Sequence, residues 1–209
     1  VLVTEIGFTK DIAAWCETTK NTLIDIVEED KVYKAYVMKG SNEIKTNSEN
    51  RVFETHDSVT IVVFSGELDK AMAAFIIGTG AASMGKKVTM FFTFWGLSII
   101  KKKADVDKMF MEKMFDTMLP EDINKLGLSK MNMGGLGSKM MKKVMKEKNV
   151  DDLPTLMNNA KELGIKFIAC SMSMDVMGIK EEELVDGVEI GGVATYLGDA
   201  EKSGVNLFI

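Results

Sequence analysis

The stretch "SVTIVVFSGELDKAMAAFIIGTGAASMGKKVTMFFTFWG", residues 58–96, decides the fold. Residues 58–65 form an almost continuous apolar run, which is typical of a strand buried on both faces. Residues 67–85 predict a helix that ends at Gly85. The expected apolar stripe of this helix consists of Leu68, Met72, Phe75, Ile76 and Ala81. A second buried strand is expected over residues 86–96, so the stretch reads strand, helix, strand.

The same alternation continues to the end of the chain. Strands are expected over residues 165–170, 188–192 and 205–209. Helices are expected over residues 105–119, 138–148, 151–164, 179–187 and 193–204. Strands that alternate with helices predict an α/β fold, in which a parallel sheet is flanked by helices.

The first forty residues follow a different pattern. Residues 1–40 read strand, helix, strand, strand, with a hairpin turn over residues 28–31, and predict a small α+β segment. Residues 41–56 are polar, have no sustained period and are interpreted as a linker. The expected organisation is therefore a segment over residues 1–40, a linker over residues 41–56 and a domain over residues 57–209.

Composition excludes several classes of function. The net charge of −5 argues against nucleic-acid binding, which needs a basic footprint. The longest nearly apolar run, residues 88–100, is too short for a membrane span of about 20 residues. The single histidine, His56, falls in the linker, so a histidine-based zinc site is not expected. We predict no metal and no cofactor.

Two cysteines, Cys16 and Cys170, cannot form the disulfide framework of a small secreted domain. The residues after Val1 do not resemble a signal peptide, and the simplest interpretation is a cytoplasmic chain with free thiols. Because the sequence opens at Val1 directly into a strand-like segment, we expect it to be a fragment or a processed form of a longer protein.

Residues 80–87, "GAASMGKK", match most of a phosphate-binding loop motif. The position that needs serine or threonine is Lys87, however, and the motif should follow a strand and begin a helix. This segment ends a helix and begins a strand. The interpretation is therefore a helix end followed by lysines, which are favoured there by the helix dipole.

Cys170 ends a predicted parallel strand, and ligands of open α/β sheets bind outside the carboxyl ends of the strands. Free N–H groups of the next residues favour a thiolate, and serines there add hydrogen bonds. The second strand ends at the same edge, so its last residues should line the same pocket. The candidate site is Cys170 with Ser171, Met172, Ser173, Thr93, Trp95 and Gly96. A buried structural thiol is the alternative at Cys170 and the favoured interpretation of Cys16.

Nine methionines fall between residues 109 and 145, around a centre that contains several glycines. Methionine adapts to irregular surfaces, so one interpretation is a docking surface or a mobile lid. The other interpretation is that these methionines fill the core of a long segment that leaves the sheet between two strands. The methionines are Met109, Met111, Met114, Met118, Met131, Met133, Met140, Met141 and Met145.

Three stretches resemble the DsrE/DsrF-like sulfur-relay family, in the branch labelled peroxiredoxin-like. They are residues 62–102, residues 128–145 with "LSKMNMGGLGSKMMKKVM", and residues 169–197 with "ACSMSMDVMGI" and "EELVDGVEIGGVATYL". The resemblance covers residues 57–209. It implies a flavodoxin-like fold, a homo-oligomer, and transfer of sulfane sulfur as a cysteine persulfide, with Cys170 as the family cysteine.

Residues 7–25 resemble the second helix of a TusA-like (SirA-like) sulfur-carrier domain. That family carries sulfur on a cysteine in a Cys-Pro-x-Pro motif, which this sequence lacks. Cys16 therefore does not inherit the carrier role, and the resemblance implies a truncated carrier domain fused to the DsrE-like domain.

The functional hypothesis is a sulfur-relay module, a persulfide sulfurtransferase in which Cys170 accepts sulfane sulfur and passes it on. The donor would be a rhodanese-like or TusA-like protein or domain, and the acceptor a thiol. Two alternatives stay open. One is a thiol-based peroxide or disulfide reductase, which needs a resolving thiol. The other is a non-catalytic interaction or assembly domain of a larger fusion protein.

Overall fold

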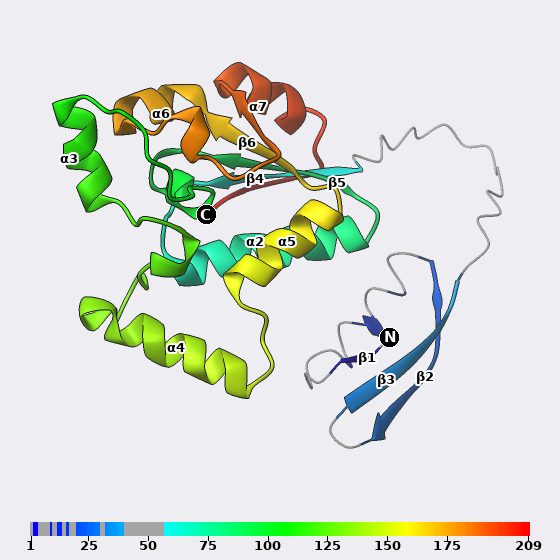
Figure 1. The fold of residues 1–209 in the computed structure, drawn as a ribbon. Coiled ribbons are helices and arrows are strands. Elements are labelled where there is room, and N and C mark those ends of the chain that lie inside the picture. The colour runs from blue at the N-terminus through cyan, green and yellow to red at the C-terminus, as the bar shows by residue number, and fades with distance from the viewer. Residues whose placement is uncertain are drawn as a thin grey trace. The chain divides into compact units, whose positions relative to one another are not determined.

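The structure, a computed structural model, describes residues 2–3, 9, 12–13, 16, 20–29, 32–39 and 57–209. The chain divides into two compact units, Val1–Glu54 and Thr55–Ile209 (Figure 1). The predicted linker, residues 41–56, and His56 with it, lie outside the described residues.

The first unit contains a three-stranded antiparallel sheet of β1 (Leu2–Val3), β2 (Thr22–Glu29) and β3 (Val32–Met38). β3 is the central strand, and Glu29 pairs with Val32, which places β2 and β3 in a hairpin as the sequence predicts. Ile12 and Cys16 are buried together with Ala35 of β3. The expectation that Cys16 is a buried thiol is confirmed.

The second unit is built on a five-stranded sheet in the order β7-β6-β5-β4-β8, and every neighbouring pair is parallel. Apart from its first residue, β4 is buried along its whole length, because helices cover both faces of the sheet. The predicted α/β fold, an open parallel sheet of the flavodoxin-like class, is confirmed. The strands are β4 (Ser58–Val63), β5 (Lys87–Phe92), β6 (Lys166–Cys170), β7 (Val188–Gly191) and β8 (Val205–Phe208).

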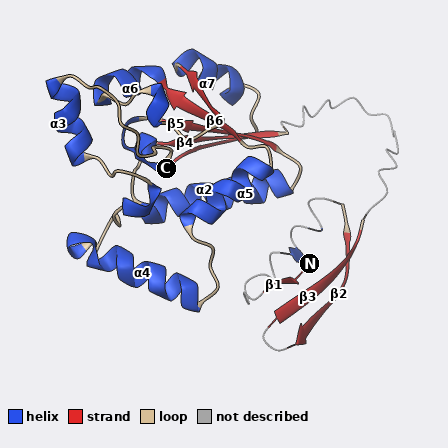
Figure 2. Cartoon of the chain, viewed as in Figure 1, coloured by secondary structure: helices blue, strands red, loops and turns tan. Residues whose placement is uncertain are grey.

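Two helices, α2 (Leu68–Ser83) and α5 (Leu153–Glu162), lie on one side of the sheet, and α7 (Val193–Ala200) lies on the other (Figures 1 and 2). Gly85 has φ +82° just after α2, so the predicted helix end is confirmed. The predicted stripe of α2 is wrong at Ile76, which is half exposed. Phe75 takes the inward position, and the next residue on a helix points about 100° away.

A long excursion separates β5 from β6 and contains η1 (Phe94–Ile99), α3 (Phe110–Met118), η2 (Ile123–Lys125), η3 (Met133–Gly135) and α4 (Leu136–Glu147). The predicted strand over residues 86–96 is therefore too long, because the chain turns into η1 after Phe92. α6 (Ser171–Met177) directly follows β6, and the predicted helix over residues 179–187 is reduced to η4 (Glu181–Glu183). Within the described residues, no helix combines the length and apolar character needed to cross a bilayer.

Candidate functional site

Cys170 is the last residue of β6 and the residue before α6, as expected. Side chains alternate along a strand, so Phe167 and Ala169 face the large core beneath α2 and α5. Ile168 and Cys170 face the opposite side and pack with Val62 and Phe91. Cys170 is only 1% exposed. A reagent can therefore reach its sulfur only after a neighbouring side chain moves.

Helix α7 packs on the side of the sheet to which Cys170 points. Tyr196 of α7 packs against the cluster that contains Cys170, and its ring centroid is 5.3 Å from that of Phe91. None of the residues of α7 is fully buried, in contrast to the several buried residues of α2 and α5. The cluster that contains Cys170 is therefore contacted by a lightly packed helix, in which Tyr196 makes the contact. No sequence signal singles out Tyr196, which is distant from Cys170 along the chain.

Two of the predicted site residues meet directly. The hydroxyl oxygens of Thr93 and Ser173 lie 2.7 Å apart and share a buried hydrogen bond. Thr93 follows β5 and Ser173 belongs to α6, so the bond joins the ends of two neighbouring strands. One hydroxyl donates and the other accepts, so neither buried oxygen is left without a hydrogen-bond partner. An unpaired polar group in a buried place would be costly.

The other predicted residues are dispersed around this edge. Trp95 is half exposed and lines a cavity of about 190 Å³ that none of the other predicted site residues lines. Gly96 is buried, and a Cβ added there would lie 2.0 Å from the carbonyl oxygen of Val63. Gly96 thus lets η1 approach β4. Ser171 is partly buried and Met172 is half exposed.

The backbone of Phe94, between Thr93 and Trp95, is strained. Its φ is +47°, in the left-handed region that bulky side chains rarely adopt. The Phe94 ring lies 5.5 Å from that of Phe64, which holds the turn in place after β4 and β5. Strained residues of this kind are concentrated at functional sites, and Phe94 lies at the carboxyl edge of the sheet. A positive φ also occurs at three residues that flank α4, Met131, Met133 and Asn149. No local sequence signal predicts this conformation.

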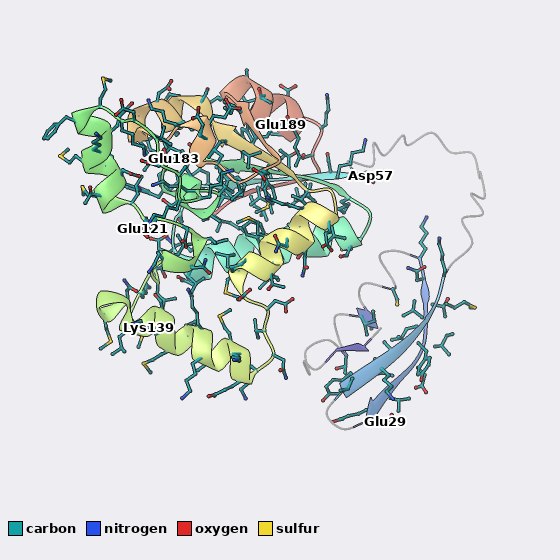
Figure 3. All side chains as sticks on the ribbon, in the orientation of Figure 1. Glu29, Asp57, Glu121, Lys139, Glu183 and Glu189 are labelled. Carbon is teal, nitrogen blue, oxygen red and sulfur yellow. The ribbon has the colours of Figure 1, made fainter. Side chains whose placement is uncertain are left out.

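A network of buried charged side chains lies next to η1, α3 and η4. The Lys108 ammonium is 2.8 Å from the Glu183 carboxylate and 3.1 Å from that of Asp116. Lys101 also pairs with both acids, and its distance to Glu183 is 3.5 Å. Glu183, which is labelled in Figure 3, is 2% exposed, and both lysines are buried. The network connects the segment after η1 with α3 and η4, and sequence reasoning missed it.

Electrostatics holds α3 in place. Burial raises the pKa of Asp116, but hydrogen bonds from Lys101 and Lys108 outweigh it and hold that pKa below its usual range. A hydrogen bond from Lys180, 2.6 Å away, lowers the pKa of Glu112 in the same helix. Both acids of α3 are therefore stabilised in the charged form. Asp116 connects α3 to the segment after η1, and Glu112 connects it to the segment that follows α6.

The comparisons with known proteins identify the class. Residues 55–208 match the model of the DsrE/DsrF/DrsH-like family, and the chain belongs to that family. It is 53% identical over 152 residues to the uncharacterized protein YrkE of Bacillus subtilis (strain 168). This alignment covers 72% of this chain and 95% of that protein.

A second relative carries a functional name. The sulfur carrier protein DsrE2 of Allochromatium vinosum is 34% identical over 162 residues, which cover 72% of this chain and 97% of that protein. Among solved structures, the ychN protein from E. coli aligns with a TM-score of 0.44 and 10% identity, over 73% of this chain and 98% of that one.

Proposed function

We propose that this chain is a sulfur-relay module in which Cys170 carries sulfane sulfur as a persulfide. The observation that carries the proposal is the position of Cys170 at the carboxyl edge of the sheet in a member of this family. The 34% identity to a protein named as a sulfur carrier supports it.

The proposed chemistry is an exchange between sulfur atoms. The deprotonated Cys170 sulfur attacks the outer sulfur of a donor persulfide, and the donor thiolate leaves as its S–S bond breaks. An acceptor thiolate then attacks the outer sulfur on Cys170 and regenerates the Cys170 thiolate. Each step forms one S–S bond and breaks another, so no external oxidant or reductant is needed. Positioning of the attacking and leaving sulfurs in line supplies most of the rate.

The partners follow from the same proposal. The donor is a rhodanese-like or TusA-like protein or domain, and the acceptor is a thiol in the cytoplasm. We also propose that residues 1–40 are the later part of a TusA-like domain and that residues 57–209 form the relay domain. A homo-oligomer, as expected from the family resemblance, is tested by measuring the molar mass in solution.

The decisive experiment is the intact mass of the reduced protein after exposure to glutathione persulfide. Wild type and Cys16→Ser are expected to gain one sulfur atom, which cyanide removes as thiocyanate. Cys170→Ser is expected to gain none, because the attacking sulfur is gone. Cys16→Ser is the matched control, since it also removes one buried cysteine. Equal sulfur addition to Cys170→Ser would overturn the proposal. A Cys16–Cys170 disulfide formed with peroxide would favour the reductase alternative.

Burial of Cys170 gives a second prediction. Tyr196→Ala, in the Cys16→Ser background, is expected to raise the rate of alkylation of Cys170 by iodoacetamide on the order of tenfold. Truncation of a partly buried aromatic ring should lower the free energy of local opening by at least about 1.4 kcal/mol.

Tyr196→Phe is the control for this experiment, because it keeps the ring against Phe91. It is expected to react at the wild-type rate. An unchanged rate in Tyr196→Ala would mean that access to Cys170 is governed by another element, such as α6.

A further inference from the structure

Positive charge is concentrated in one segment of this acidic chain. Residues 123–148 hold seven lysines and one acidic residue, Glu147, although the whole chain has a net charge of −5. The lysines are Lys125, Lys130, Lys139, Lys142, Lys143, Lys146 and Lys148. Helix α4, which carries most of them, lies beyond α2 and α5 on the side away from the sheet (Figure 1).

The lysines of α4 share one face. Lys139, Lys142, Lys143 and Lys146 are separated by three, one and three residues, which places them within about a third of the helix circumference. Lys139 is labelled on α4 in Figure 3. Lys143 lies 4.0 Å from Glu147, and the Lys142 ammonium donates to the carbonyl of Asn124. The lysine face is defined as these four residues. Lys142 also interacts with Asp152, and Lys142 and Lys146 line a hollow with Asp151 and Asp152, so acidic residues compensate one edge of the face. Lys139 and Lys143 lie away from that hollow.

An apolar stripe runs beside the lysine face. Leu136, Met140 and Val144 recur every four residues and are each about half exposed or more. The inner side of α4 is occupied by Ser138 and Met145, which are buried. The exposed apolar stripe is thus separate from the surface by which α4 packs on its own unit.

A hollow adjoins the amino end of α4. Its volume is about 360 Å³, and three of its lining residues are Lys125, Lys139 and Lys142. The lysine face and this hollow together form a positive surface with an apolar stripe along one side.

We infer that α4 docks an acidic segment of a partner protein that also presents aliphatic side chains, as an acidic amphipathic helix does. Carboxylates of the partner would pair with the lysine face, and its aliphatic side chains would pack on the apolar stripe with the spacing of helix-in-groove recognition. Methionine in the stripe suits adaptable packing. The inference does not rest on sulfur chemistry at Cys170.

Charge complementarity and composition favour a protein over a bilayer as the occupant. Helices that lie in a membrane interface usually carry several Trp, Phe or Leu residues on the apolar face, whereas α4 has a single leucine, Leu136, and no aromatic residue. Its lysines lie along one side of the stripe only, whereas a helix lying flat on a bilayer has its stripe flanked on both sides.

The test uses the full chain and a fluorescein-labelled helical peptide of glutamate and leucine, with the leucines four residues apart. Fluorescence anisotropy is expected to show saturable binding that weakens with salt. The triple variant Lys139→Glu, Lys143→Glu, Lys146→Glu should weaken binding by at least about tenfold, with a smaller salt dependence. Met140→Ser with Val144→Ser should weaken binding while the salt dependence stays unchanged.

The matched control is Lys87→Glu, Lys103→Glu, Lys202→Glu, which makes the same change in net charge at exposed lysines elsewhere. It is expected to bind the peptide like wild type. Equal weakening in the control would show non-specific attraction and overturn the inference. Binding to phosphatidylglycerol vesicles without binding to the peptide would assign α4 to a membrane instead. A lower molar mass of the α4 variants in solution would assign it to a second copy of this chain.

Discussion

Glu183→Gln is expected to lower the free energy of unfolding of the second unit by about 3–5 kcal/mol. Glu183 is 2% exposed, and its carboxylate balances Lys101 and Lys108 together with Asp116. Neutral glutamine would leave two buried ammonium groups facing a single carboxylate. An uncompensated buried charge costs much more than a surface pair contributes.

The measurement is urea unfolding followed by the fluorescence of Trp95, in a Trp15→Phe background that leaves one tryptophan, in the second unit. Glu182→Gln is the control, because Glu182 is the exposed neighbour of Glu183 and the same charge is removed. It should change stability by less than about 0.5 kcal/mol. Adding Lys108→Met to Glu183→Gln should recover part of the loss, since the charges balance again. Equal effects of the two glutamine variants would contradict the role of the network.

Gly96→Ala is expected to cost about 3 kcal/mol or more, because η1 passes directly against the end of β4. The new Cβ would lie 2.0 Å from the Val63 oxygen and 2.7 Å from its carbonyl carbon. Both are backbone atoms of β4, a strand with a neighbour on each side, which cannot turn away as a flexible side chain can. The φ of Gly96 is outside the left-handed region, so the cost comes from the contact and not from backbone strain.

The control for this substitution is Gly80→Ala in α2, where a new Cβ meets nothing within 4 Å. Alanine in an exposed helix interior should stabilise the second unit by about 0.5–1 kcal/mol. The same unfolding assay measures both variants. Wild-type stability of Gly96→Ala would mean that η1 can move away from β4 without loss. If Gly96→Ala displaces η1 from β4 and lowers the stability, the Thr93–Ser173 hydrogen bond should break as well, because Thr93 directly precedes η1.

The sequence by itself determined most of the strands and helices of the second unit and the edge at which the candidate site lies. Continuous apolar runs identified β4, β5 and β6, because a strand buried on both faces cannot alternate with polar residues. Their alternation with helices predicted a parallel sheet, so Thr93 and Cys170 were expected at the same edge of that sheet. The structure adds that β5 and β6 are neighbouring strands. The resemblance to the DsrE/DsrF-like family rested on motifs in the same residues, and the family match confirms it.

Only the tertiary structure decided what surrounds those residues. Periodicity shows which face of an element is apolar, but topology determines which element covers it. Tyr196 packs against the cluster that contains Cys170 because the connection from β7 to β8 returns across the sheet and places α7 on the opposite side from α2. Glu183 looks like its exposed neighbours in sequence, and it is buried because η4 meets Lys101 and Lys108 in space. Long-range contacts of this kind have no local signal, and they determine whether the sulfur of Cys170 is reachable.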